Sequence, residues 1–197
     1  MPDRLSRPHP RRRTHVSLAV AAVAALACGK EAIPEPRLAP GVTEAASITV
    51  TSGTFPSGGT IPVDHRCDGK EVRPPLTLSA PPPGTKSLVV IVDDPDSSSG
   101  LFTHMILFDV DPSRLKLAEG TSATDGGPDA RYGSNDFGSA RYGGPCPPHG
   151  ELHRYRFRVI AADRKVGLTE GATRAQIFAA LDGHILGEGS LTGTFGH

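Results

Sequence analysis

The segment from Ser87 to Asp93 places the strongest limit on the fold. It reads SLVVIVD, a nearly continuous run of Leu, Val and Ile with no apolar–polar alternation. β-Branched residues favour strands, and a short unbroken apolar run is typical of a strand that is buried on both faces. The sequence therefore predicts an interior strand in a β-rich domain.

A second strand is predicted over His153–Ala161, where the side chains alternate. His153, Tyr155, Phe157 and Val159 share one face, and three arginines, at positions 154, 156 and 158, share the other. This period of two indicates one buried face and one solvated basic face. Further strands are expected at four places: Ser47–Val50, Leu76–Ser79, Thr103–Val110 and Ser190–Phe195.

One helix is predicted over Arg174–Leu181. Thr173 stands at the N-cap position with Gln176 three residues later, which is the spacing of a capping box, and Gly183 supplies the stop. The Gly-, Pro- and Ser-rich stretch Gly120–Pro148 predicts a long surface excursion. Many strands, few helices and frequent turns indicate a mainly β protein, a two-sheet antiparallel β-sandwich with one or two short peripheral helices.

The N-terminus has the pattern of an export signal. Basic residues up to Arg13 precede the apolar run Val16–Ala25, which is too short to cross a bilayer. We expect a signal peptide over 1–27, then lipidation of Cys28, a tether over 28–45 and one domain over 46–197. Cleavage by the ordinary signal peptidase after Ala25-Leu26-Ala27 is the alternative. The expected location is a membrane anchored through lipid, facing the periplasm or the cell exterior.

Charge and cysteine content narrow the classes of partner. Lys plus Arg equals Asp plus Glu, at 21 each, so the chain lacks the basic excess expected of a nucleic-acid binder. With Cys28 lipidated, Cys67 and Cys146 remain as an even pair in an oxidising compartment, where a disulfide is expected. Two reduced, buried cysteines are the alternative.

Polar residues gather at the ends of the predicted strands. Asp94 and Asp96 follow the interior strand, His104 begins the next strand, and His153 begins another just after Pro147-Pro148. Strands that end at the same edge of a sheet can bring such groups into one shallow cavity. The sequence therefore predicts a strand-end site.

These motifs also carry a family resemblance. They are Asp94-Pro95-Asp96, His104, Asn135-Asp136-Phe137-Gly138, Tyr142-Gly143-Gly144-Pro145-Cys146-Pro147-Pro148-His149-Gly150, His153-Arg154-Tyr155, Cys67-Asp68-Gly69 with Pro74-Pro75-Leu76, and Gly183-His184. Because these motifs occur together and in sequence order, the chain resembles the phosphatidylethanolamine-binding protein family, also called the Raf kinase inhibitor protein family. The resemblance is to the short bacterial branch of the family. The resemblance covers about Ser47 to Phe195.

The resemblance implies a β-sandwich with a small pocket for phosphate-like and carboxylate anions. The implied ligand-binding residues are Asp94, His104, Gly143, Gly144, Pro147, Pro148, His153 and Tyr155. One departure is Met105, where the family often has Trp, so headgroup selectivity at that edge is expected to differ.

The chemistry of these side chains agrees with anion binding. Histidine charges near neutral pH, a tyrosine O–H can donate to an anionic oxygen, and the N–H groups of Gly143 and Gly144 could form an anion nest. Asp94 would repel a bare phosphate, so it is expected to orient a histidine or to accept from an ammonium group.

The predicted function is non-catalytic binding of a small anionic ligand, such as a phosphate or a phospholipid headgroup. No nucleophile elbow is present, Cys146 lies between prolines, and no H-E-x-x-H or C-x-x-C motif occurs, so neither catalysis nor a metal or other cofactor is expected. The alternative is an inhibitor of a protease or kinase that acts through a protein–protein surface, which Gly120–Pro148 could present.

Overall fold

The computed structural model describes residues 32–197. The predicted signal peptide, Cys28 and the first residues of the predicted tether lie outside this described part. Within it, no helix is long and apolar enough to cross a membrane.

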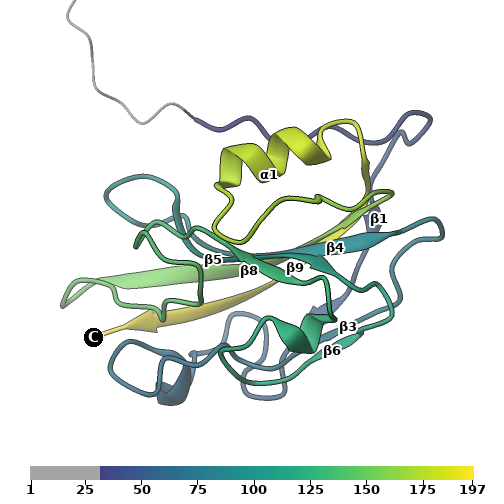
Figure 1. The fold of residues 1–197 in the computed structure, drawn as a ribbon. Helices are drawn as coiled ribbons and strands as arrows, with labels where there is room; N and C mark the ends of the chain where they lie inside the picture. Colours follow the sequence, from purple (N-terminus) through teal and green to yellow (C-terminus); the bar gives the residue numbers. More distant parts are fainter. Residues whose placement is uncertain (1–31) are drawn as a thin grey trace, which may run out of the picture. The chain divides into compact units, whose positions relative to one another are not determined.

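Two β-sheets and one α-helix make up the described chain (Figure 1). The six-stranded sheet has the order β1-β9-β8-β4-β5-β7, and the three-stranded sheet has the order β2-β3-β6. All strand pairs are antiparallel except β1 with β9. The predicted two-sheet, mainly β fold is confirmed. The elements are β1 (Ala46–Ser47), β2 (Val50–Thr51), η1 (Val63–His65), β3 (Leu76–Leu78), β4 (Ser87–Asp94), β5 (Phe102–Val110), β6 (Lys116–Leu117), η2 (Thr124–Gly126), β7 (Arg131–Gly133), β8 (Leu152–Ala162), α1 (Arg174–Leu181) and β9 (Ile185–Gly196).

Strand β4 is buried along its whole length because both faces of the large sheet are covered. Leu88, Val90 and Val92 join an apolar core that includes residues of the small sheet. Val89 and Ile91 join a second core, which the helix α1 closes on the opposite face (Figure 1). The unbroken apolar run in the sequence thus reflects a strand packed between two layers.

Strand β8 alternates as predicted. Tyr155, Phe157 and Val159 are fully buried in the core between the sheets, while the intervening arginines face the other side. Helix α1 begins with the predicted capping box, in which the Thr173 hydroxyl accepts from the Gln176 N–H at 3.3 Å and the Thr173 N–H donates to Gln176 Oε1 at 2.9 Å.

The Gly120–Pro148 stretch is better anchored than its composition predicts. It contributes β7, which pairs with β5, and it contains the buried residue Asn135. The Asn135 side chain donates to the Arg141 carbonyl at 2.9 Å and accepts from the Ser139 N–H at 2.9 Å. These bonds fold the loop back on itself, so it is not the free excursion that we expected.

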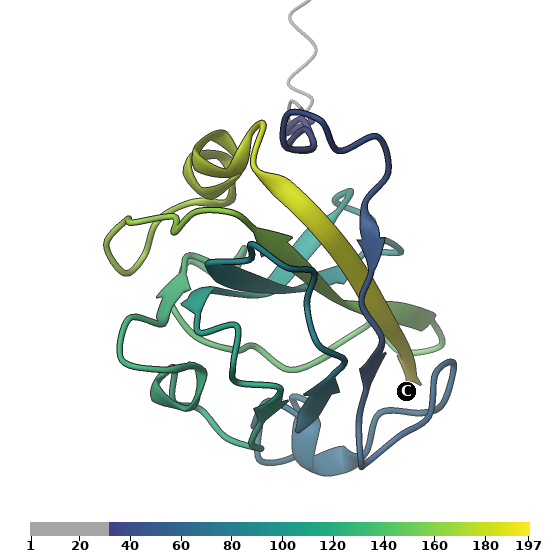
Figure 2. The ribbon, with the colours of Figure 1, turned by 90° about the vertical axis from the view of Figure 1, so that its right-hand side faces the viewer.

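Part of the predicted tether lies on the domain surface. Glu35 pairs with Arg158 at 2.6 Å, Arg37 pairs with Asp182 at 2.6 Å, and the Ala39 N–H donates to the Ile185 carbonyl. Figure 2 shows the following residues running beside β9, where β1 pairs with it. The second half of the predicted tether therefore belongs with the domain.

All four edge strands of the two sheets, β1, β7, β2 and β6, are two or three residues long. Beyond β1, the outer edge of β9 is covered by irregular chain. The N–H groups of Ile48, Gly58 and Ile61 donate to carbonyls of β9 at 2.7–2.9 Å.

Candidate functional site

The four side chains predicted to form the strand-end site come together. Asp94 ends β4, His104 lies near the start of β5, and His153 and Tyr155 lie near the start of β8. The His104 and Tyr155 ring centroids are 5.3 Å apart, and those of Tyr155 and His153 are 6.4 Å apart. His153 Nδ1 lies 2.7 Å from Asp94 Oδ2, so the four groups form one continuous buried cluster.

A β-bulge explains the position of His104. Val92 pairs with Met105, but the next residue, Asp93, pairs with Thr103, so His104 is the extra residue. A bulge bends the strand and redirects side chains, and here it leaves both His104 and Met105 among the groups of the inner face. Met105 was expected to form an edge of the site, but it is fully buried in the core.

Two carboxylates hold the ring of His153. Nδ1 bonds to Asp94, and Nε2 lies 3.0 Å from Glu151 Oε2. Burial lowers the pKa of His153, but hydrogen bonds to these acids and their negative charges outweigh it, and the net shift is upward. Asp94 Oδ1 accepts from the Asp96 N–H at 2.8 Å. With both of its oxygens engaged, Asp94 orients the histidine, the first of the two roles considered for it.

His104 differs from His153 in charge. Its Nδ1 lies 2.9 Å from the Gly143 carbonyl oxygen, which can only accept, so Nδ1 carries the proton. Nε2 makes no hydrogen bond within residues 32–197. Burial lowers the pKa of His104, and the bond to Gly143 and nearby acids offset this only in part. His104 is therefore neutral at pH 7, with an acceptor at Nε2.

Tyr155 is fully buried, and its hydroxyl has no hydrogen-bond partner in the described chain. Burial raises the pKa of Tyr155, and the charge of Asp94 raises it further. The hydroxyl therefore remains protonated and keeps a free donor beside the two imidazoles.

Gly143 and Gly144 do not form the expected anion nest. The Gly143 N–H donates to the His104 carbonyl at 3.0 Å, and the Gly144 N–H donates to Glu71 Oε1 at 3.2 Å. Glycine is needed at these two positions for a steric reason. A Cβ on Gly143 would lie 2.5 Å from the Phe137 ring, and one on Gly144 would lie 2.7 Å from the Arg66 backbone.

The Phe137 ring forms one wall of the site, a role that the sequence did not predict. Its ring packs edge-on against His104, with centroids 5.3 Å apart, and against Phe102 at 4.8 Å. Asn135 holds this turn, because its Oδ1 accepts from the Phe137 N–H at 3.1 Å. The Asn135–Gly138 motif in the sequence was the signal for this turn, but only the structure shows that the turn places Phe137 against His104.

The expected disulfide is present. Cys67 and Cys146 are bonded, with Cα atoms 5.5 Å apart and a separation of 79 positions in sequence. Next to it, Pro147 is buried and Pro148 is exposed. Among the described residues, the one group with metal-ligand spacing is Cys67, Cys146 and His197, whose two sulfurs are already joined.

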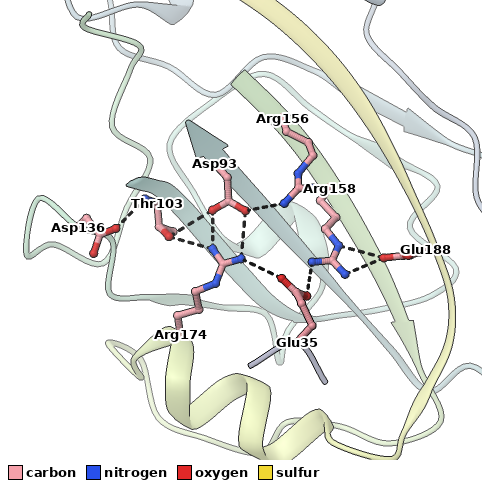
Figure 3. A network of polar contacts seen from close by, with 8 residues as sticks. All are labelled: Glu35, Asp93, Thr103, Asp136, Arg156, Arg158, Arg174 and Glu188. Atoms are coloured by element: carbon pink, nitrogen blue, oxygen red, sulfur yellow. Dashed lines mark hydrogen bonds and ion pairs between the residues drawn. The ribbon is translucent and has the colours of Figure 1, made fainter. Parts of the chain in front are cut away.

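The neighbouring aspartate, Asp93, faces the other side of the sheet and takes part in a separate network (Figure 3). It is fully buried and binds the Arg174 guanidinium at 2.5 and 3.1 Å. Thr103 Oγ1 also donates to it, and Glu35 joins Arg158 to this group. Of the two consecutive acids, one therefore stabilises the outer face and the other serves the strand-end site.

The fold and the site define a class of protein, a two-sheet β domain with a buried His–Tyr–His–Asp cluster where three strands end. The sequence matches the family described as phosphatidylethanolamine-binding protein over residues 51–196, and the chain belongs to that family.

Two relatives and one solved structure support membership of this family. A UPF0098 protein of Methanothermobacter thermautotrophicus is 40% identical over 72% of this chain and 93% of its own length. A Mycobacterium tuberculosis protein named "Putative lipoprotein LppC" is 37% identical over 77% of this chain and 73% of that protein. The crystal structure of Escherichia coli YbcL, titled a new member of the mammalian PEBP family, is similar with a TM-score of 0.70 and 29% identity, over 77% of this chain and 99% of that one.

Proposed function

We propose that this protein binds a small oxyanion, of the phosphate or carboxylate class, in the strand-end site and catalyses no reaction there. One observation carries the proposal. Within residues 32–197 the buried hydroxyl of Tyr155 has no hydrogen-bond partner, and Nε2 of His104 makes no hydrogen bond. The Tyr155 ring packs against His104 and lies near His153, whose pKa is raised. A hydroxyl donor near an imidazole whose charged form is favoured is suited to an anionic oxygen.

The absence of an activated nucleophile supports the non-catalytic part of the proposal. Within residues 32–197, His104 and His153 hydrogen-bond only to a backbone carbonyl and to carboxylates. Neither bonds to a serine, threonine or cysteine, and the sulfur of Cys146 is held in the disulfide. The residues are arranged to orient and hold a ligand.

The proposed setting is the cell envelope, with lipid on Cys28. The name of the mycobacterial relative supports a lipoprotein, and the basic and apolar N-terminus of this chain supports export. Mass spectrometry of the protein purified from membranes tests this directly, because a lipid on Cys28 adds the mass of its acyl chains to the N-terminal peptide.

Ligand binding is tested by NMR titration of the purified domain with inorganic phosphate, phosphoethanolamine and acetate. We expect saturable shifts of the His104 and His153 ring signals. The part-exposed pair of His184 and Asp163, joined at 2.8 Å, is an internal control whose signals should not move. No shift at millimolar anion would overturn the proposal. Inhibition of an envelope protease that survives substitution of both site histidines would instead favour a protein–protein surface.

A further inference from the structure

Two positions predicted to receive an anion are occupied by carboxylates of the chain itself. Glu151 Oε2 lies 3.0 Å from His153 Nε2, and Glu71 Oε1 accepts from the Gly144 N–H at 3.2 Å. Both acceptors belong to the rim of the strand-end site, because the Gly143 carbonyl binds His104 and His104 packs on Tyr155. A ligand oxygen that reached the same donors would replace a bond that already exists.

The two acids on His153 differ in how firmly they are held. The side chain of Asp94 is 6% exposed and has a second bond, to the Asp96 N–H. The side chain of Glu151 is 53% exposed, and His153 is its one partner among the described residues. Glu151 also directly follows Gly150, which has a φ of 85°, in the turn that leads into β8. Glu151 can therefore leave while Asp94 stays.

Charge acts in the same direction. With Glu151 in place, two carboxylates surround one imidazolium, and the site carries a net negative charge. The nearby Asp96 is neutralised by Arg154, at 2.6 Å, and His104 is neutral. An incoming anion must therefore both displace Glu151 and approach against its charge. Removing that one carboxylate would leave Asp94 and His153 as a balanced pair.

We propose that Glu151 is a built-in competitor that occupies the anion position on His153 and lowers the affinity of the site for anions. The inference rests on the proposed function. The measured affinity then equals the intrinsic affinity multiplied by the fraction of molecules in which Glu151 has moved away from His153. A ligand that bonds only His153 gains little from the exchange. An oxyanion that also accepts from the Tyr155 hydroxyl gains a second bond.

The experiment compares phosphate and acetate binding to the wild-type protein, E151Q and E151A by NMR titration. D163N is the matched control, because Asp163 forms a similar part-exposed pair with His184. We expect both Glu151 variants to bind phosphate roughly two- to fivefold more tightly, the range for losing one partly exposed charge pair. We expect acetate to gain no more than phosphate, because displacement of Glu151 lowers both affinities by the same factor and phosphate carries the larger negative charge. The affinities of D163N should be unchanged.

The outcomes separate the inference from the proposed function. If the wild-type protein binds phosphate and the Glu151 variants bind it equally or more weakly, Glu151 is not a competitor and the anion site remains. If no protein in the series binds phosphate or acetate, the anion site is absent and the inference is lost with it. Thermal melting of each variant shows whether a changed affinity reflects a changed fold.

Discussion

Asp93→Ala tests whether the buried network on the outer face stabilises the fold. Asp93 is fully buried and accepts two bonds from Arg174, whose side chain is itself 9% exposed. The substitution leaves that guanidinium without its main counter-ion. Removal of one partner from a buried ion pair costs about 3–5 kcal/mol. With a urea slope of about 2 kcal/mol per molar, the unfolding midpoint should fall by about 2 M.

The assay is equilibrium urea unfolding followed by circular dichroism, with Asp129→Ala as the control. Asp129 pairs with Lys165 at 2.5 Å, but both side chains are more than half exposed and the pair is screened by solvent, so its loss should change stability little. The double variant D93A/R174M should recover part of the loss, because it removes the stranded charge. The reasoning is refuted if D93A is no more destabilising than D129A, or if the double variant is worse than D93A alone.

Four further predictions concern the site and the disulfide next to it. Tyr155→Phe should raise the free energy of unfolding by about 1 kcal/mol, because it removes a buried hydroxyl without a partner, and should weaken phosphate binding; urea unfolding and NMR titration check the two effects. In an NMR pH titration, His153 should titrate above and His104 below the ordinary histidine value of about 6.5. The contribution of His153 to stability should be complete below pH 6.5 and be lost as the pH rises through its raised pKa. The contribution of His104 should instead be lost as the pH falls below 6.5. Unfolding of H153Q and H104Q at several pH values measures both contributions. Reduction of the Cys67–Cys146 bond should cost about 4 kcal/mol by the chain-entropy estimate, and equal melting temperatures with and without a thiol reductant would contradict this.

Much of the fold could be predicted because side-chain period and burial agree. The unbroken run of β4 indicated a strand with two covered faces, and the alternation in β8 correctly separated buried residues from the arginines. The order of the strands could not be predicted, because pairing between distant segments leaves no local pattern. The composition of Gly120–Pro148 was misleading for a related reason. Asn135 satisfies the backbone of its turn from within, and Gly and Ser content does not reveal such a bond.

The sequence predicted which residues form the site better than it predicted how they interact. The residues at the strand ends converge because β4, β5 and β8 are neighbours in one sheet. The bulge at His104 could not be predicted, since it depends on the register between two strands. The glycine amides were assigned to a ligand because their type permits it, yet His104 and Glu71 already accept from them. Glu151 carries no motif, and only its distance to His153 reveals a role.

The short outer strands have a consequence for how copies of this chain meet. Unpaired edges are where β proteins join one another into aggregates, and long, flat edges are the most dangerous. Here the four long strands, β4, β5, β8 and β9, lie inside the large sheet, and β9 is shielded by the loop residues that bond to its carbonyls. The described chain therefore offers a second molecule little unpaired strand backbone on which a shared sheet could grow.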